Sequence, residues 1–154
     1  MIDLTRKLKV DQLDRKLSRL KVLDSLEIPP KGWINAIRTT INMSLSQLGR
    51  RLRKTPVAVK EMEEREESRS ITLKKLIEVG NALDLHFVYG FIPRESSIQE
   101  MIEKRAEEVA RGIVTRTSHT MALEDQENSQ DRLRQAIRER AQLLVQELPK
   151  HLWD

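Results

Sequence analysis

The sequence predicts an all-α protein with a helix-turn-helix domain near its centre. Charged residues make up 34% of the 154 residues, aromatic residues make up 3%, and there are five glycines and five prolines. This composition is typical of a helix-rich chain with an aliphatic core. Apolar residues at helical spacing predict three parts: an N-terminal amphipathic helix at 1–28, a helix-turn-helix domain at 31–93 and a helical region at 94–154.

The composition argues against several classes of protein. The chain has no cysteine, so we expect no disulfide framework and no thiolate metal site. His86, His119 and His151 lack zinc-ligand spacing, and no glycine-rich phosphate loop occurs. No apolar run is long enough for a membrane span, and the charged N-terminus lacks the apolar core of a signal peptide. We therefore expect a cytoplasmic protein that is not an enzyme and uses no cofactor or metal.

Positive charge is concentrated in the part of the chain before Arg94. Up to Pro93 there are 18 lysines and arginines against 12 acidic residues, and from Arg94 onward there are 10 against 12. The net charge is therefore +6 in the first part and −2 in the second. This asymmetry favours a nucleic-acid-binding part followed by a part with another role.

The first predicted helix is amphipathic with a basic polar face. Its leucines recur at mostly helical spacing, and lysines and arginines lie between them. Either this helix packs on the domain or on a partner chain, or its basic face contacts phosphates. Pro29 and Pro30 end the segment. The next helix begins near Trp33, which we expect to be its largest core side chain.

Residues 44–83 have the pattern of a helix-turn-helix, in which the last helix is capped by Ser70 or Thr72. Ser44 is a good N-cap for a helix over 45–52, in which Gly49 lets the next helix cross closely. Thr55 caps that second helix. Pro56 takes its first position, where a missing N–H costs nothing.

The second helix suits DNA recognition. Its first turn would enter the major groove, where Val57 and Ala58 meet thymine methyls and Lys60 meets a guanine edge or a phosphate. Arg53 stands where a left-handed residue is common, at a cost of about 1 kcal/mol. The alternative is an ordinary helical hairpin with a solvated basic face. The predicted DNA-binding residues are Ser44, Arg50, Arg51, Arg53, Lys54, Thr55, Pro56, Val57, Ala58 and Lys60.

A glutamate cluster follows directly in this helix. Its members are Glu61, Glu63, Glu64, Glu66 and Glu67. They would repel DNA if they faced it, so we expect them on the solvated far side, with Glu63 bracing a basic residue of the domain.

The helical spacing of apolar residues is interrupted at residues 85–92. This β-branched and aromatic run, stopped by Pro93, predicts a strand. No second strand is predicted in the chain, so we expect a homodimer in which two copies pair their strands about a two-fold axis. The residues of this predicted dimer strand are Phe87, Val88, Tyr89 and Phe91.

The pattern after Pro93 predicts two helices. Ser97–Glu100 is a capping box that opens the first, and a polar break at 115–130 separates it from the last. Pro149 ends the last helix, and we expect Trp153 to dock on this helical part.

Four segments carry a resemblance to a known family. They are GWINAIRTTINMSLSQLGRRL, ITLKKLIEVGNALDLHFVYGFIP, HTMALEDQ and the terminal LWD. The chain resembles the Xre/Cro-type helix-turn-helix proteins, which have a lambda-repressor-like fold, and especially the mobile mystery protein A family. This resemblance implies a transcriptional regulator, encoded beside a Fic-domain protein, that represses its own operon as an antitoxin-like component and binds that protein.

The resemblance suggests an inhibitory role for HTMALEDQ. Fic enzymes are held inactive by a helix with Ser or Thr, three residues, Glu, and then Gly or Asn. Thr120 and Glu124 match this pattern, whereas Asp125 departs from it. A glutamate that pairs with a phosphate-binding arginine would block productive ATP placement. The alternative is that the segment only packs or carries a surface ion pair.

We expect Glu124→Ala to restore AMP transfer by a Fic protein bound to this chain, because the carboxylate that blocks the arginine is lost. The measurement is incorporation of labelled AMP by the co-purified complex. Unchanged incorporation would leave the segment as ordinary structure.

Overall fold

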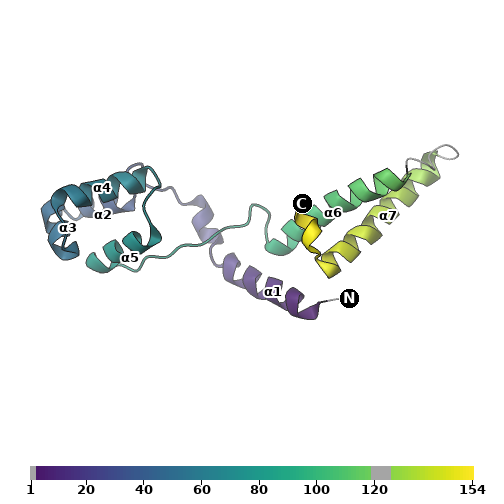
Figure 1. Cartoon of the computed structure of the whole chain (residues 1–154), viewed down its shortest axis with the longest axis horizontal. Coiled ribbons are helices and arrows are strands. Elements are labelled where there is room, and N and C mark those ends of the chain that lie inside the picture. The colour runs from purple at the N-terminus through teal and green to yellow at the C-terminus, as the bar shows by residue number, and fades with distance from the viewer. Residues whose placement is uncertain (1–2, 119–125) are drawn as a thin grey trace. The chain divides into compact units, whose positions relative to one another are not determined.

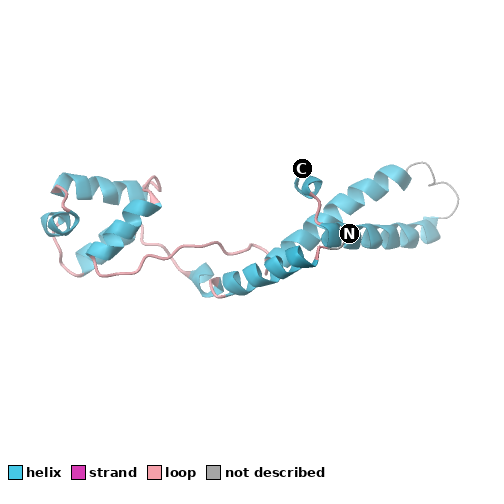
Figure 2. Ribbon diagram, turned by 60° about the horizontal axis from the view of Figure 1, so that its bottom comes forward, coloured by secondary structure: helices cyan, strands magenta, loops and turns pink. Residues whose placement is uncertain are grey.

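The computed structural model describes residues 3–118 and 126–154, and within them the chain consists of helices and loops (Figures 1 and 2). This confirms the predicted all-α class. The chain divides into a central unit, Ser25–Tyr89, and a terminal unit, Met1–Asp24 with Gly90–Asp154. None of the described helices is long and apolar enough to cross a membrane.

The central unit contains four helices: α2 (Trp33–Thr40), α3 (Leu45–Leu52), α4 (Pro56–Glu67) and α5 (Leu73–Ala82). They surround a small aliphatic core to which each helix contributes at least one buried side chain. The buried core residues are Ile34, Leu48, Val59, Met62 and Val79. Leu48 and Val59 have no exposed surface, as the helical spacing requires of inward positions.

Side-chain caps begin α3, α4 and α5, at Ser44 and Thr55 as the sequence predicts and at Thr72 rather than Ser70. Ser44 Oγ accepts a hydrogen bond from Gln47 N at 3.1 Å, and Gln47 Oε1 accepts one from Ser44 N at 2.8 Å. Thr55 caps α4 and Thr72 caps α5 in the same manner, each accepting from the backbone N–H three residues on. Each cap satisfies a helix-terminal donor that would otherwise lack a partner.

A residue from another helix caps α2. Both carboxylate oxygens of Glu66 accept hydrogen bonds, from Trp33 N at 2.6 Å and from Ile34 N at 2.9 Å. The preceding residue is Gly32, with φ +86°, and a Cβ there would lie 2.5 Å from Glu66 Oε2. Only glycine allows both this backbone conformation and this close approach.

The second link between α2 and α4 is a buried ion pair. Arg38 Nε lies 2.5 Å from Glu63 Oε1, and only 12% and 8% of the two side chains are exposed. Asn35 Nδ2 also donates to Glu63, and Arg38 Nη1 donates to the Met43 carbonyl. The hydrogen bond to Glu63 and the attraction of its carboxylate raise the pKa of Arg38. Glu63 therefore braces a basic residue of the domain, as predicted.

Trp33 does not fill the core of the central unit. Its side chain is 40% exposed, whereas its neighbour Ile34 is 4% exposed. The expectation that Trp33 is the largest core side chain was therefore wrong. Position Trp33 begins α2, where its N–H is held by Glu66, and the inward direction falls one residue later.

The terminal unit joins the first helix of the chain to the last two. α6 (Ile98–Ser118) and α7 (Gln126–Glu147) lie side by side as an antiparallel hairpin, and α1 (Leu4–Ser18) packs against α6 (Figures 1 and 2). A short 3₁₀ helix, η1 (Lys21–Ser25), follows α1. The buried core residues of this unit are Ile102, Ala106, Ala110, Ile137, Leu144 and Leu152.

Long-range polar contacts hold α1 in this unit. Asp14 accepts hydrogen bonds from Ile98 N at 2.7 Å and from Gln99 N at 3.1 Å. It thus caps α6 together with Ser97, whose hydroxyl accepts from Glu100 N. Arg6 donates to the Leu148 carbonyl at 3.0 Å. Since no residue of α1 is buried, these bonds fix a helix that apolar contact holds only partly.

The C-terminal residues form a second 3₁₀ helix, η2 (Lys150–Trp153), which packs on α6. Arg105 of α6 donates to the Leu152 carbonyl at 2.6 Å and to Asp154 O at 2.5 Å. The side chain that docks is Leu152, which has no exposed surface, whereas Trp153 is 49% exposed. The expectation that Trp153 docks was therefore wrong by one position.

The strand predicted for residues 85–92 is not formed in the single chain. These residues are extended loop, and the described part of the chain contains no strand. The physical reason is that a strand is defined by a ladder of hydrogen bonds to another strand. The rings of Phe87 and Tyr89 stack with centroids 6.2 Å apart, which fits the two-residue period of extended backbone.

We expect Glu63→Ala to lower the free energy of unfolding by about 3 kcal/mol, because it leaves the Arg38 guanidinium buried without its partner. Urea unfolding followed by circular dichroism measures the change. Glu64→Ala, at an exposed position of the same helix, is the matched control and should change stability by less than about 0.5 kcal/mol. Equal midpoints for the two variants would contradict the structural role of the pair.

Candidate nucleic-acid interface

A tight turn joins α3 to α4. Arg53 ends α3 in the left-handed conformation, with φ 56° and ψ 43°, as its position in the sequence predicts. Gly49 lies within α3, and its carbonyl oxygen accepts a hydrogen bond from Lys54 N at 2.8 Å. A Cβ on Gly49 would lie 2.6 Å from the Lys54 carbonyl oxygen. The buried glycine therefore lets the turn backbone close tightly over α3, and this sets where α4 begins.

The first turn of α4 is open to a ligand. Thr55 is the N-cap and Pro56 is the first helical residue, and the turn contains no acidic side chain. Val57 is 66% exposed, and Ala58 is half-buried beside it. The helix dipole and the N–H of Val57 favour an anionic partner, while Ala58 N and Val59 N already donate to Thr55.

The predicted basic residues divide into two groups. Arg50, Arg53 and Lys60 are exposed, and their side chains make no hydrogen bond or ion pair with any described residue. Arg51 instead donates from Nη1 to the Ala82 carbonyl at 3.2 Å, which ties α3 to the end of α5. Lys54 is half-buried in the turn. The first group is available to phosphates, whereas Arg51 acts in this structure as a brace between helices.

The glutamates of α4 lie on two opposite faces. Glu63 and Glu66 face α2, as described above, on the same side as the buried Val59 and Met62. Glu61 and Glu64 are exposed and lie one and two turns beyond Val57, on the same helical face as that residue. The expectation of a single solvated far side was therefore wrong. Lys60 lies beside the exposed face that carries Val57, Glu61 and Glu64.

Glu61 is the residue that sequence reasoning missed at this surface. The signal was present, because Val57, Glu61 and Glu64 follow the i, i+4, i+7 spacing of one helical face. Charge repulsion alone predicts that Glu61 lies away from DNA. The packing of α4 leaves this face exposed regardless.

The other predicted site residues lie elsewhere or outside the described chain. Phe87, Val88 and Tyr89 belong to the extended segment that ends the central unit, and Phe91 belongs to the terminal unit. Thr120, Glu124 and Asp125 lie outside the described residues. Within the described ranges, no group of three or more histidine or acidic residues could hold a metal ion.

No family description, curated protein or solved structure matches the chain in comparisons of all three kinds.

Proposed function

We propose that this chain is a sequence-specific DNA-binding protein, with an Xre/Cro-type helix-turn-helix formed by α3 and α4. One observation carries the proposal. The left-handed turn at Arg53 presents the exposed first turn of α4, and the unpaired side chains of Arg50 and Lys60 lie on either side of that turn in the sequence.

Each part of this surface has a role in the proposed complex. Val57 and Ala58 are small enough to enter the major groove and contact thymine methyls. Arg50 and Arg53 neutralise backbone phosphates, which gives affinity that falls with salt. The hydroxyl of Thr55 keeps its hydrogen for a phosphate, because its oxygen serves as the cap acceptor for Ala58 N.

Glu61 adds base selectivity to this proposal. A carboxylate at the major-groove edge accepts a hydrogen bond from the amino group of cytosine and finds no donor on guanine or thymine, and beside the amino group of adenine it meets the N7 acceptor, which repels it. Glu61 is exposed one turn after Val57 and makes no ion pair with a described residue. It is thus placed to favour one base while opposing non-specific binding through its charge.

We further propose that two copies bind one operator. The exposed side chains of Val88 and Tyr89, at 62% and 69%, leave an apolar extended segment uncovered in the single chain. Pairing of two such segments as strands would satisfy both backbones and match a palindromic operator. The resemblance to mobile mystery protein A suggests that the operator belongs to the chain's own antitoxin-like operon and that binding represses it.

We expect Arg50→Ala with Lys60→Ala to weaken binding at least about tenfold for the best duplex selected from a random library. The loss of phosphate contacts should also reduce the dependence of log affinity on log salt by roughly one per lost contact. Fluorescence anisotropy at several salt concentrations measures both effects. The same titration gives the number of chains on each duplex.

Arg132→Ala with Arg140→Ala removes the same charge from exposed positions of α7 and is the matched control. If no sequence is enriched from the library, or if both double variants lose affinity equally, the proposed interface is wrong.

We expect Glu61→Ala to remove a cytosine preference at one position of each half-site and to raise affinity for unrelated DNA. A single carboxylate contact discriminates between bases by about 1–3 kcal/mol. Sequencing of duplexes selected by the two proteins measures the preference. Glu67→Ala is the control, because Glu67 is exposed near the C-terminal end of α4. An unchanged preference at every position would exclude Glu61 from the base-reading surface.

A further inference from the structure

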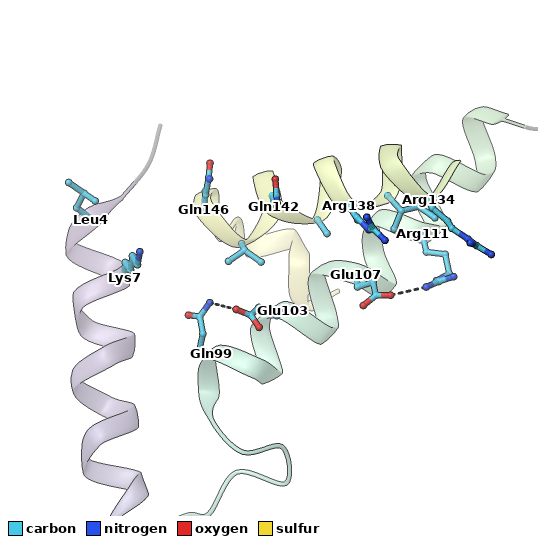
Figure 3. A pocket seen from close by; sticks show the side chains of 13 residues that line it. Leu4, Lys7, Gln99, Glu103, Glu107, Arg111, Arg134, Arg138, Gln142 and Gln146 are labelled. Carbon is cyan, nitrogen blue, oxygen red and sulfur yellow. Dashed lines mark hydrogen bonds and ion pairs between the residues drawn. The ribbon is translucent and has the colours of Figure 1, made fainter. Parts of the chain in front are cut away.

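The terminal unit has an open groove between the start of α1 and the α6–α7 hairpin (Figure 3). Its volume is 990 Å³. Ile137, Ala141 and Val145 of α7 are spaced one turn apart and form an apolar floor, in which Ile137 is buried in the core and Ala141 and Val145 are half-buried. One wall comes from α6 and the other from the outer face of α7. The groove lies within one unit and does not involve the proposed DNA-binding helix.

The two walls of the groove carry rows of polar side chains. Along α7 the row runs through Arg134, Arg138, Gln142 and Gln146, and Figure 3 shows it opposite the row Gln99, Glu103, Glu107 and Arg111 of α6. Each row repeats every fourth residue, so it follows one face of its helix. From Arg134 to Gln146 the wall is about 18 Å long, which is a little over three turns of helix.

The charge of the groove is predominantly positive. Four cationic side chains line it, against two carboxylates. Arg111 Nη2 pairs with Glu107 Oε1 at 2.8 Å, and Gln99 Nε2 donates to Glu103 Oε1 at 2.9 Å. Arg134 and Arg138 are exposed and pair with no described residue. The acidic wall is thus already engaged, while the basic wall of α7 is available to a partner.

We propose that this groove binds an acidic amphipathic helix of a partner protein. An apolar stripe on that helix would cover the half-buried Ala141 and Val145 and the exposed Leu4 of α1, and carboxylates beside the stripe would pair with Arg134 and Arg138. This is the helix-in-groove mode of recognition, in which apolar anchors at helical spacing give affinity and flanking charges give orientation. The proposal is independent of DNA binding by the central unit.

Two other occupants fit the groove less well. A second copy of the chain would bring an identical groove with the same positive excess, so its unpaired arginines would meet like charge. Nucleic acid would meet an apolar floor and a wall containing Glu103 and Glu107. An acidic amphipathic helix satisfies both the floor and the basic wall.

The test uses the full chain and three synthetic probe peptides of about 18 residues, long enough to form a helix. The first has a leucine stripe at helical spacing flanked by glutamates. The second has lysine in place of each glutamate. The third has the composition of the first in an order without a stripe. We expect fluorescence anisotropy to show binding of the first peptide alone.

Arg134→Glu with Arg138→Glu should weaken that binding at least about tenfold, because two attractive contacts become repulsive. Arg132→Glu with Arg140→Glu is the matched control, since these exposed arginines lie on α7 outside the groove, and should leave affinity within about twofold. Equal binding of the three peptides, or equal loss in the two double variants, would overturn the proposal.

Two further measurements on the Arg134→Glu, Arg138→Glu variant detect the other occupants. A fall in mass at sedimentation equilibrium would show that the groove joins two copies of the chain. A fall in affinity for duplex DNA, beyond that of the control variant, would show a nucleic-acid surface. Either result would overturn the proposal, whereas unchanged mass and DNA affinity together with lost peptide binding would support it.

Discussion

The carboxylates of Glu63 and Glu66 hold α4 against α2 through hydrogen bonds and an ion pair. These bonds determine which face of α4 remains exposed. Glu66 caps the first two N–H groups of α2, and Glu63 holds the Arg38 guanidinium in a buried pair. Side chains on a helix have fixed angular positions, so an inward Glu63 and Glu66 require an outward Val57 and Glu61. A core of five buried aliphatic side chains alone would define this orientation less sharply.

The turn before α4 works with this contact. Gly49 and the left-handed Arg53 bring the chain back over α3 within three residues, so Thr55 starts α4 at a defined place. Arginine in that conformation costs roughly 1 kcal/mol compared with glycine. The same residue then adds a positive charge beside the exposed end of α4. A strained backbone position and a charged surface are thus combined at one residue.

Much of the local structure could be predicted from single positions. Ser44 and Thr55 start helices because their hydroxyl oxygens accept from N–H groups three residues away, a distance at which sequence alone suffices. The same rule left Ser70 and Thr72 open for α5, and the structure shows Thr72 as the cap. The inward or outward direction was harder, and Trp33 and Trp153 were each misjudged by one position. The size and hydrophobicity of a side chain do not show whether that residue or its neighbour faces the core.

The sequence by itself determined the helical class, the helix starts and the excess of positive charge before Arg94, because all three depend on composition or on neighbours within one turn. Only the tertiary structure decided the partners of residues far apart in the chain. Asp14 caps α6 across 84 residues, Glu66 caps α2 across 32, and Arg51 is held by a carbonyl 31 residues away. These bonds depend on how the helices pack. No local sequence pattern therefore shows which of several carboxylates or guanidinium groups will reach a given helix end.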